Sequence, residues 1–128
     1  MIVRYVFDTG ALIAAERGQQ RALRFLDLVR LGRAVIAVPM PVILEWWRGR
    51  NDVRERILRA VSIEPLSLPI AKAAGEALAE LRSVDARRSI DAAVMATAAL
   101  RGGTVLTQDV EDLELLGVHF PSVRVLGV

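Results

Sequence analysis

Residues 2–18, IVRYVFDTGALIAAERG, set the architecture of the chain. Residues 2–7 form a short apolar run with β-branched and aromatic side chains, which predicts a strand. Asp8 and Thr9 follow directly, and either side chain can cap a short helix that Gly18 ends. The chain therefore opens with a strand, a turn and a helix, as in folds whose strands alternate with helices.

The rest of the chain repeats this alternation. Apolar residues recur at helical spacing between turn residues, and short β-rich runs separate these segments. The pattern predicts an α/β fold with a mostly parallel five-stranded sheet covered by helices on both faces, a three-layer α/β/α arrangement. We expect helices over residues 19–31, 42–50 (bent near Gly49), 52–60, 69–81, 89–101 and 110–116, and further strands over residues 34–38, 61–66, 104–107 and 123–128.

The composition bounds the class of protein. The chain has 128 residues, 53% of them hydrophobic, no cysteine and a formal net charge of +2. This length suits one core, so we expect a single domain over residues 1–128. Disorder is excluded by the apolar content, and the longest apolar stretch is too short for a membrane span. Asp8 interrupts what would be the apolar part of a signal peptide, so we expect a cytoplasmic protein.

Acidic residues stand where the local pattern predicts apolar ones. Asp8 follows the first strand and Asp109 follows the fourth, so both carboxylates lie at one sheet edge if these strands are neighbours. Glu45 and Asp91 lie in apolar helical segments, where an unpaired carboxylate is costly. Asp112 comes shortly after Asp109. These acids are the candidate functional residues.

Converging carboxylates repel one another and take up protons unless a cation compensates them. This set offers only oxygen ligands, which favours Mg²⁺ or Mn²⁺ over zinc, and such ions activate water and stabilise phosphoryl oxygens. Each acid also has a structural interpretation. Asp8 and Asp109 are possible helix caps, Glu45 a partner for an arginine, and Asp91 the frayed start of a helix. The occurrence of all four together favours the metal site.

Four segments in this order resemble those of the PIN-domain ribonucleases and, among them, the VapC toxins of toxin–antitoxin pairs. The resemblance spans the whole chain. One departure is Gly10, which stands where the family often has a serine and leaves Thr9 as the nearby hydroxyl. The segments are FDTGALIA (7–14), PVILEWWRG (41–49), SIDAAVMATAALRGG (89–103) and VLTQDVEDL (105–113).

The resemblance implies a PIN-like fold and a metal-dependent endoribonuclease. Asp8, Glu45, Asp91 and Asp109 would be catalytic, with Mg²⁺ or Mn²⁺ held by Asp8, Asp91, Asp109 and Asp112. Metal-activated water would cut structured or single-stranded loop RNA and leave 5′-phosphate and 3′-hydroxyl ends. Whether Asp109 or Asp112 is the principal ligand stays open at this point.

Groups that hold the flanking phosphates must surround such an acidic pocket. Hydroxyls and arginines beside the four segments are the candidates, and the pair Arg87 and Arg88 directly precedes one of these segments. The expected substrate-binding residues are Thr9, Thr107, Arg48, Arg50 and Arg88.

The resemblance also implies a homodimer and a cognate VapB-like antitoxin. Trp46 and Trp47 point about 100° apart on a helix, so we expect one inside and the other at a partner surface. The alternative is a catalytically silent PIN-fold module that binds RNA or protein. Phospho-aspartate folds are disfavoured, because they require a late lysine and Lys72 is the only lysine.

Overall fold

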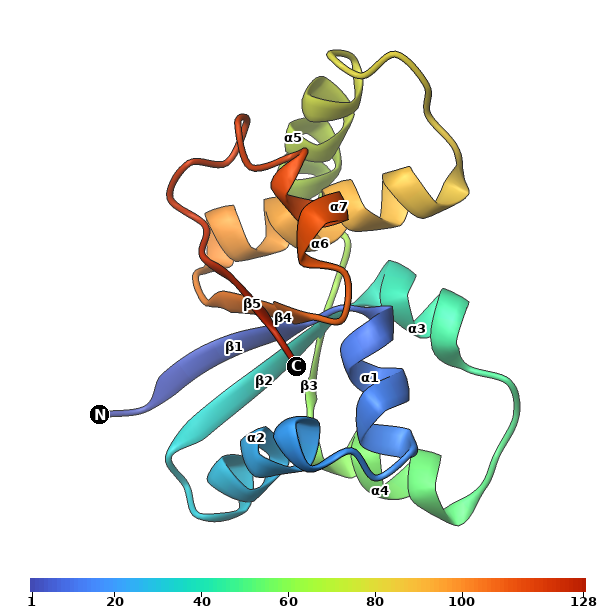
Figure 1. Cartoon of the computed structure of the whole chain (residues 1–128), viewed down its shortest axis with the longest axis vertical. Coiled ribbons are helices and arrows are strands. Elements are labelled where there is room, and N and C mark those ends of the chain that lie inside the picture. The colour runs from blue at the N-terminus through green and yellow to red at the C-terminus, as the bar shows by residue number, and fades with distance from the viewer.

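The computed structural model describes residues 1–128 and contains five strands and seven helices (Figure 1). The strands are β1 (Val3–Phe7), β2 (Ala34–Pro39), β3 (Ser62–Glu64), β4 (Thr104–Thr107) and β5 (Val125–Gly127). The helices are α1 (Thr9–Glu16), α2 (Gln20–Arg30), α3 (Met40–Trp46), α4 (Asp52–Ala60), α5 (Leu68–Leu78), α6 (Ala86–Arg101) and α7 (Val110–Glu114).

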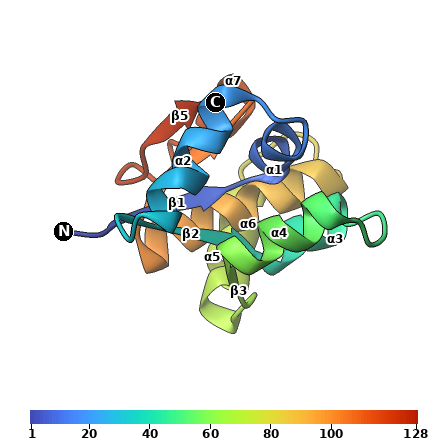
Figure 2. The same cartoon turned by 90° about the horizontal axis from the view of Figure 1, so that it is seen from below.

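The strands form one sheet in the order β3-β2-β1-β4-β5, and every neighbouring pair is parallel. Helices α1, α2 and α4 lie on one side of this sheet and α5 and α6 on the other (Figures 1 and 2). The predicted α/β/α architecture is confirmed, and the sheet is parallel throughout. No helix of the structure has the length and apolar character needed to cross a membrane.

The core explains why these segments take these conformations. The central strands bury side chains on both faces, as expected of a parallel sheet, and Val6, Phe7, Ile36 and Leu106 are almost fully inaccessible. Residues 92–98 of α6 are all buried. Four of these seven are alanines, and their small side chains let α6 lie close against the sheet.

Two helix boundaries differ from the sequence prediction. Helix α6 begins at Ala86 instead of residue 89, because the side chain of Asp85 caps it by accepting a hydrogen bond from the Arg88 N–H at 2.8 Å. Helix α3 ends at Trp46, since Trp47 has an extended backbone, and it does not continue to Gly49. Three further ends lie beyond the predicted bounds: α3 begins at Met40, α5 begins at Leu68 and β2 ends at Pro39. The remaining differences are shorter ends of predicted elements.

Strands β1 and β4 are neighbours, and Phe7 pairs in register with Leu106. The residues that follow these strands therefore emerge side by side at the carboxyl edge of the sheet. Helices α1 and α7 begin at this edge, and the starts of α3 and α6 lie beside it in Figure 1. This edge is where ligands bind in parallel α/β folds.

Candidate active site

Asp8 connects β1 to α1. Its carboxylate caps α1 by accepting a hydrogen bond from the Ala11 N–H at 2.8 Å, and only 7% of the residue is exposed. Burial raises the pKa of Asp8. Hydrogen bonds from the Thr107 side chain and the Ala11 N–H oppose this rise, and the charges of Asp109 and Glu45 add to it. The capping interpretation is thus correct, yet the same carboxylate faces other acids.

Asp91 lies on α6, half-buried, with its carboxylate toward the same edge. Its pKa is raised to about 7, first by burial and then by the charge of Asp8, with smaller contributions from Asp112 and Glu45. The charge of Arg87 opposes this rise, but Arg87 forms its ion pairs with Asp109 and Asp112 and not with Asp91. Asp91 is therefore a buried acid without a compensating partner.

Glu45 comes from α3, on the other side of this edge from α7. It is half-buried between exposed Leu44 and buried Trp46. Its charge raises the pKa of both Asp8 and Asp91, so its carboxylate lies near both. No ion pair joins Glu45 to an arginine, so the structure does not support the pairing considered from the sequence.

Asp109 and Asp112 lie in the turn after β4 and in the first turn of α7. The Asp109 N–H donates to the Thr107 hydroxyl at 2.9 Å, but the Asp109 carboxylate does not cap α7. It accepts instead from Arg87 Nη2 at 2.8 Å, with Asp112 Oδ2 3.7 Å from the same nitrogen. A hydrogen-bonding contact with the Asp112 side chain raises the pKa of Asp109, because it stabilises the protonated form of the Asp109 carboxyl.

The donor set suits a hard divalent cation. It consists of carboxylates alone, and it raises the pKa of its own members by mutual repulsion, which a bound cation would relieve. No three acidic or histidine side chains are already gathered into a ligand cluster. A cation held by Asp8 and Asp91 would compete with Arg87 for the negative charge of Asp109, whose Oδ2 accepts from the guanidinium.

The structure disperses the predicted substrate-binding residues. Thr107 is fully buried, so its hydroxyl positions Asp109 and Asp8, whereas the Thr9 hydroxyl is buried without a hydrogen-bond partner. Arg48 donates to the carbonyls of Leu44 and Trp47, and Arg50 pairs with Glu55. Arg88 lies in the first turn of α6, where its backbone N–H donates to Asp85, and no hydrogen bond or ion pair engages its guanidinium.

Arg87 was noted in the sequence as a basic residue before Asp91, but it was left out of the expected substrate-binding residues. Its position four residues before Asp91, on the same face of a helix, was the available signal. That signal required knowing that α6 begins at Ala86, since the predicted start at residue 89 left Arg87 outside the helix.

A hydrogen-bonded network holds α3 in place. Trp46 Nε1 donates to Glu16 Oε1 at 2.9 Å, and Arg54 Nη2 pairs with Glu16 Oε2 at 2.9 Å, so the network joins α1, α3 and α4. Arg54 also donates to the Gly49 carbonyl. Trp46 is buried as expected of one tryptophan, while half-buried Trp47 packs edge-on against it with ring centroids 6.0 Å apart.

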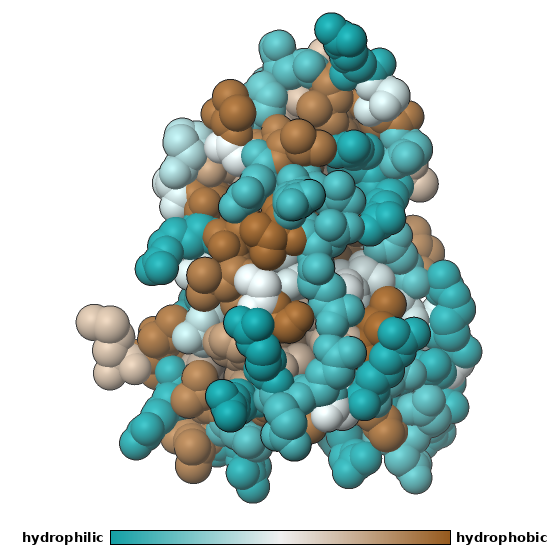
Figure 3. Space-filling model, viewed as in Figure 1, coloured by the Kyte–Doolittle hydropathy of each residue, from teal (hydrophilic) through white to brown (hydrophobic).

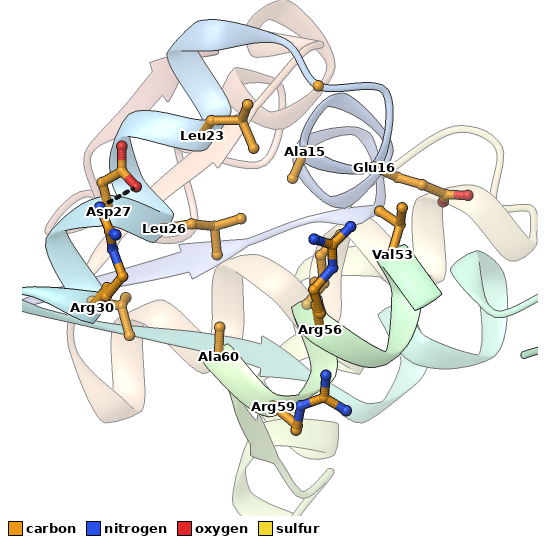
Figure 4. Close-up of a pocket in the computed structure, with 13 residues that line it drawn as sticks. Ala15, Glu16, Leu23, Leu26, Asp27, Arg30, Val53, Arg56, Arg59 and Ala60 are labelled. Carbon is orange, nitrogen blue, oxygen red and sulfur yellow. Dashed lines mark hydrogen bonds and ion pairs between the residues drawn. The ribbon is translucent and has the colours of Figure 1, made fainter. Parts of the chain in front are cut away.

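Two apolar grooves lie apart from the acidic site. The first has a volume of about 810 Å³ between α1, α2 and α4, with Leu23, Leu26 and Val53 in it and Arg56 and Arg59 along α4 (Figure 4). The second, of about 760 Å³, lies between α3, α5 and the start of α6. Figure 3 shows further apolar residues in the upper half of one face, with polar residues predominating below.

The sequence matches the family model described as PIN domain over residues 5–115. This match includes all five candidate acids. No curated protein sequence matches the chain significantly.

Several solved structures share the fold. One is a chain of VapBC2 from Rickettsia felis, crystallised bound to a DNA fragment from the VapBC2 promoter. It is 15% identical, with a TM-score of 0.72, and the match covers 98% of this chain and 99% of that chain. A chain of DNA-bound VapBC from Salmonella typhimurium is 16% identical, with a TM-score of 0.67, and the match covers 98% of each chain. A chain of FitAcB from Neisseria gonorrhoeae is 17% identical, with a TM-score of 0.62, and the match covers 95% of this chain and 96% of that chain.

Proposed function

Because this chain belongs to the PIN domain family, we propose that it is a divalent-metal-dependent endoribonuclease and the toxin of a toxin–antitoxin pair. One observation carries the catalytic part: Asp91 is a half-buried carboxylate whose pKa is raised to about 7 by burial and by the charges of Asp8, Asp112 and Glu45, although the charge of Arg87 opposes this rise. A purely structural acid would have a paired or capping carboxylate, whereas Asp91 has neither.

The proposed chemistry is hydrolysis of a phosphodiester bond. Asp8, Asp91 and Asp109 would hold Mg²⁺ or Mn²⁺, with Asp112 as a supporting ligand. When bound, the metal lowers the pKa of a water and stabilises charge on phosphoryl oxygens. The Glu45 carboxylate orients the attacking water and accepts its proton. The bond from phosphorus to the 3′-oxygen breaks and the departing 3′-oxygen takes up a proton from solvent, which leaves a 3′-hydroxyl and a 5′-phosphate.

Protein partners form the second part of the proposal. The neighbours from Rickettsia felis and Salmonella typhimurium are VapBC complexes, which supports a VapB-like antitoxin for this chain. The α1, α2 and α4 groove offers apolar surface to such a partner. The α3, α5 and α6 groove, with exposed Leu44 and Leu66, offers a second apolar surface for a homodimer. With RNA as substrate, the protein would act in the cytoplasm.

The in vitro test uses purified protein and total RNA with Mg²⁺ or with EDTA. We expect Mg²⁺-dependent cuts whose downstream fragments carry a 5′-phosphate and can therefore be ligated directly to an adaptor. Asp91→Asn should abolish cutting, while the control Asp27→Asn, an exposed acid on α2, should keep it. Equal cutting in EDTA would refute metal dependence, and no cutting would favour the silent binding module.

A further inference from the structure

Arg87 is the basic side chain that reaches the acidic site. It lies in the first turn of α6, and its Nη2 is 2.8 Å from Asp109 Oδ2 and 3.7 Å from Asp112 Oδ2. Its positive charge opposes the rise in the pKa of both Asp91 and Asp109. It is the only basic group among the principal influences on these two carboxylates.

Neighbouring arginines have partners away from these acids. These arginines hold the loop after α3 and its junction with α4 in place. Arg48 donates to the Leu44 and Trp47 carbonyls, Arg50 pairs with Glu55, and Arg54 pairs with Glu16 and donates to the Gly49 carbonyl. Arg87 is thus the cation placed to meet a phosphate bound at the carboxyl edge of the sheet.

The pairing of Arg87 leaves most of its binding capacity unused. The side chain is 66% exposed, and a single nitrogen makes both contacts. A guanidinium carries five N–H donors in a planar fork that matches phosphate oxygens. Exposed ion pairs are weak and screened, so this arrangement is easily exchanged for another.

A divalent cation and Arg87 compete for the same acid. Because Arg87 Nη2 contacts one oxygen of the Asp109 carboxylate, a cation that takes Asp109 as a ligand neutralises part of this counter-charge and weakens its attraction for the guanidinium. The freed guanidinium then lies at the mouth of a site that the cation has made less negative. An RNA phosphate is the anion that fits both the fork and the location.

We propose that Arg87 is a phosphate-binding residue of this site, retained by Asp109 and Asp112 until a divalent cation displaces it. The inference rests on the proposed ribonuclease function and adds to it a specific contact with the substrate. It adds Arg87 to the substrate-binding residues expected from the sequence, next to Arg88.

The metal arm of the test is a calorimetric titration of the protein with Mn²⁺ in the absence of RNA. Arg87→Gln removes the competing charge, so we expect it to bind Mn²⁺ roughly tenfold more tightly than the unmodified chain. The control Arg24→Gln removes an exposed charge on α2, across the sheet from α6, and should leave the affinity unchanged. Equal or weaker binding by Arg87→Gln would overturn the competition.

The RNA arm measures binding of a short, fluorescently labelled, single-stranded RNA at several salt concentrations. Ca²⁺ replaces Mg²⁺ as the oxygen-liganded cation, and a gel verifies that the RNA stays intact. Loss of one phosphate contact should weaken binding and reduce the slope of log affinity against log salt by roughly 0.7 for Arg87→Gln. Arg87→Lys should retain most of the slope, and Arg24→Gln all of it.

The two arms separate failure of this inference from failure of the proposed function. If the unmodified chain binds neither Mn²⁺ nor RNA, the ribonuclease proposal falls and this inference falls with it. If it binds both and Arg87→Gln has the same salt slope as Arg24→Gln, the ribonuclease proposal stands and Arg87 is only a solvated surface residue.

Discussion

Asp91 shows at the scale of one residue how burial prepares a carboxylate for a metal. In the metal-free folded chain its pKa is about 7, against an ordinary value of 3.8. Desolvation is the main cause, and the charge of Asp8 is the next largest. Such a residue is unfavourable for folding unless a ligand compensates it, which is typical of functional sites.

This shift predicts how stability depends on pH in EDTA. Between pH 4 and pH 7 the folded chain keeps the Asp91 proton and the unfolded chain has lost it, so Asp91 makes the fold less stable as the pH rises through this range. Asp91→Asn stays neutral and avoids this loss. Urea unfolding at pH 5 and pH 8 should show a larger advantage of Asp91→Asn over the unmodified chain at pH 8.

The same advantage at both pH values would show that Asp91 is ionised in the folded chain throughout. Asp27→Asn serves as the matched control, because Asp27 is exposed and its ion pair with Arg30 is on the surface. We expect no pH-dependent difference for this variant.

The sequence predicted the acids of the site but not their contacts. Asp8, Glu45, Asp91 and Asp109 stood out because each breaks a local apolar pattern. The positions of Arg48 and Arg50 suggested phosphate contacts, yet nearby carbonyls and Glu55 engage them. Side-chain pairing of long arginines depends on three-dimensional neighbours, which spacing along one helix does not supply.

At the scale of elements, the network around Glu16 fixes α3 and hence Glu45. The Glu16 carboxylate links the buried Trp46 indole to Arg54, whose side chain is only 19% exposed. Arg54 Nε is already buried without a hydrogen-bond partner. Loss of Glu16 would therefore leave a largely buried guanidinium without its counter-charge.

We predict that Glu16→Ala lowers the free energy of unfolding by about 3 kcal/mol. Glu16→Gln should lower it less, because its amide oxygen still accepts from Trp46. Asp27→Ala, which removes an exposed ion pair, should cost under about 0.5 kcal/mol. Chemical denaturation followed by tryptophan fluorescence measures all three, and an effect of Glu16→Ala no larger than that of Asp27→Ala would refute the role of the network.

Element type was predictable from the sequence, while element ends were not. Strands β1, β2 and β4 were predicted from their apolar β-rich runs, and α6 was predicted from its alanine-rich sequence. The start of α6 was placed three residues late because Ser89 is also a favoured cap, and only the structure shows that Asp85 makes the capping bond.

At the scale of the whole molecule, the parallel sheet order brings acids from four segments to one edge. From the sequence, the adjacency of β1 and β4 could only be assumed and not predicted, since strand order depends on long-range pairing. The apolar grooves could not be predicted from the sequence either, because each is formed by helices that are distant in sequence.

The α3, α5 and α6 groove predicts a homodimer that a single charge can weaken. Leu66 is 48% exposed beside this groove, so Leu66→Glu should shift the chain toward the monomer. Light scattering coupled to size exclusion measures the mass, and circular dichroism checks the fold. Leu31→Glu, at an exposed leucine after α2, should stay dimeric, and a monomeric unmodified chain would refute the prediction.

The central claim is that this chain cuts RNA by metal-activated water at the Asp91 site. The most direct measurement induces the unmodified chain or Asp91→Asn in bacterial cells and sequences all new RNA ends that carry a 5′-phosphate. We predict sharp cuts at defined positions with the unmodified chain alone. Identical sets of ends from both, or new ends carrying cyclic phosphates instead, would contradict the account.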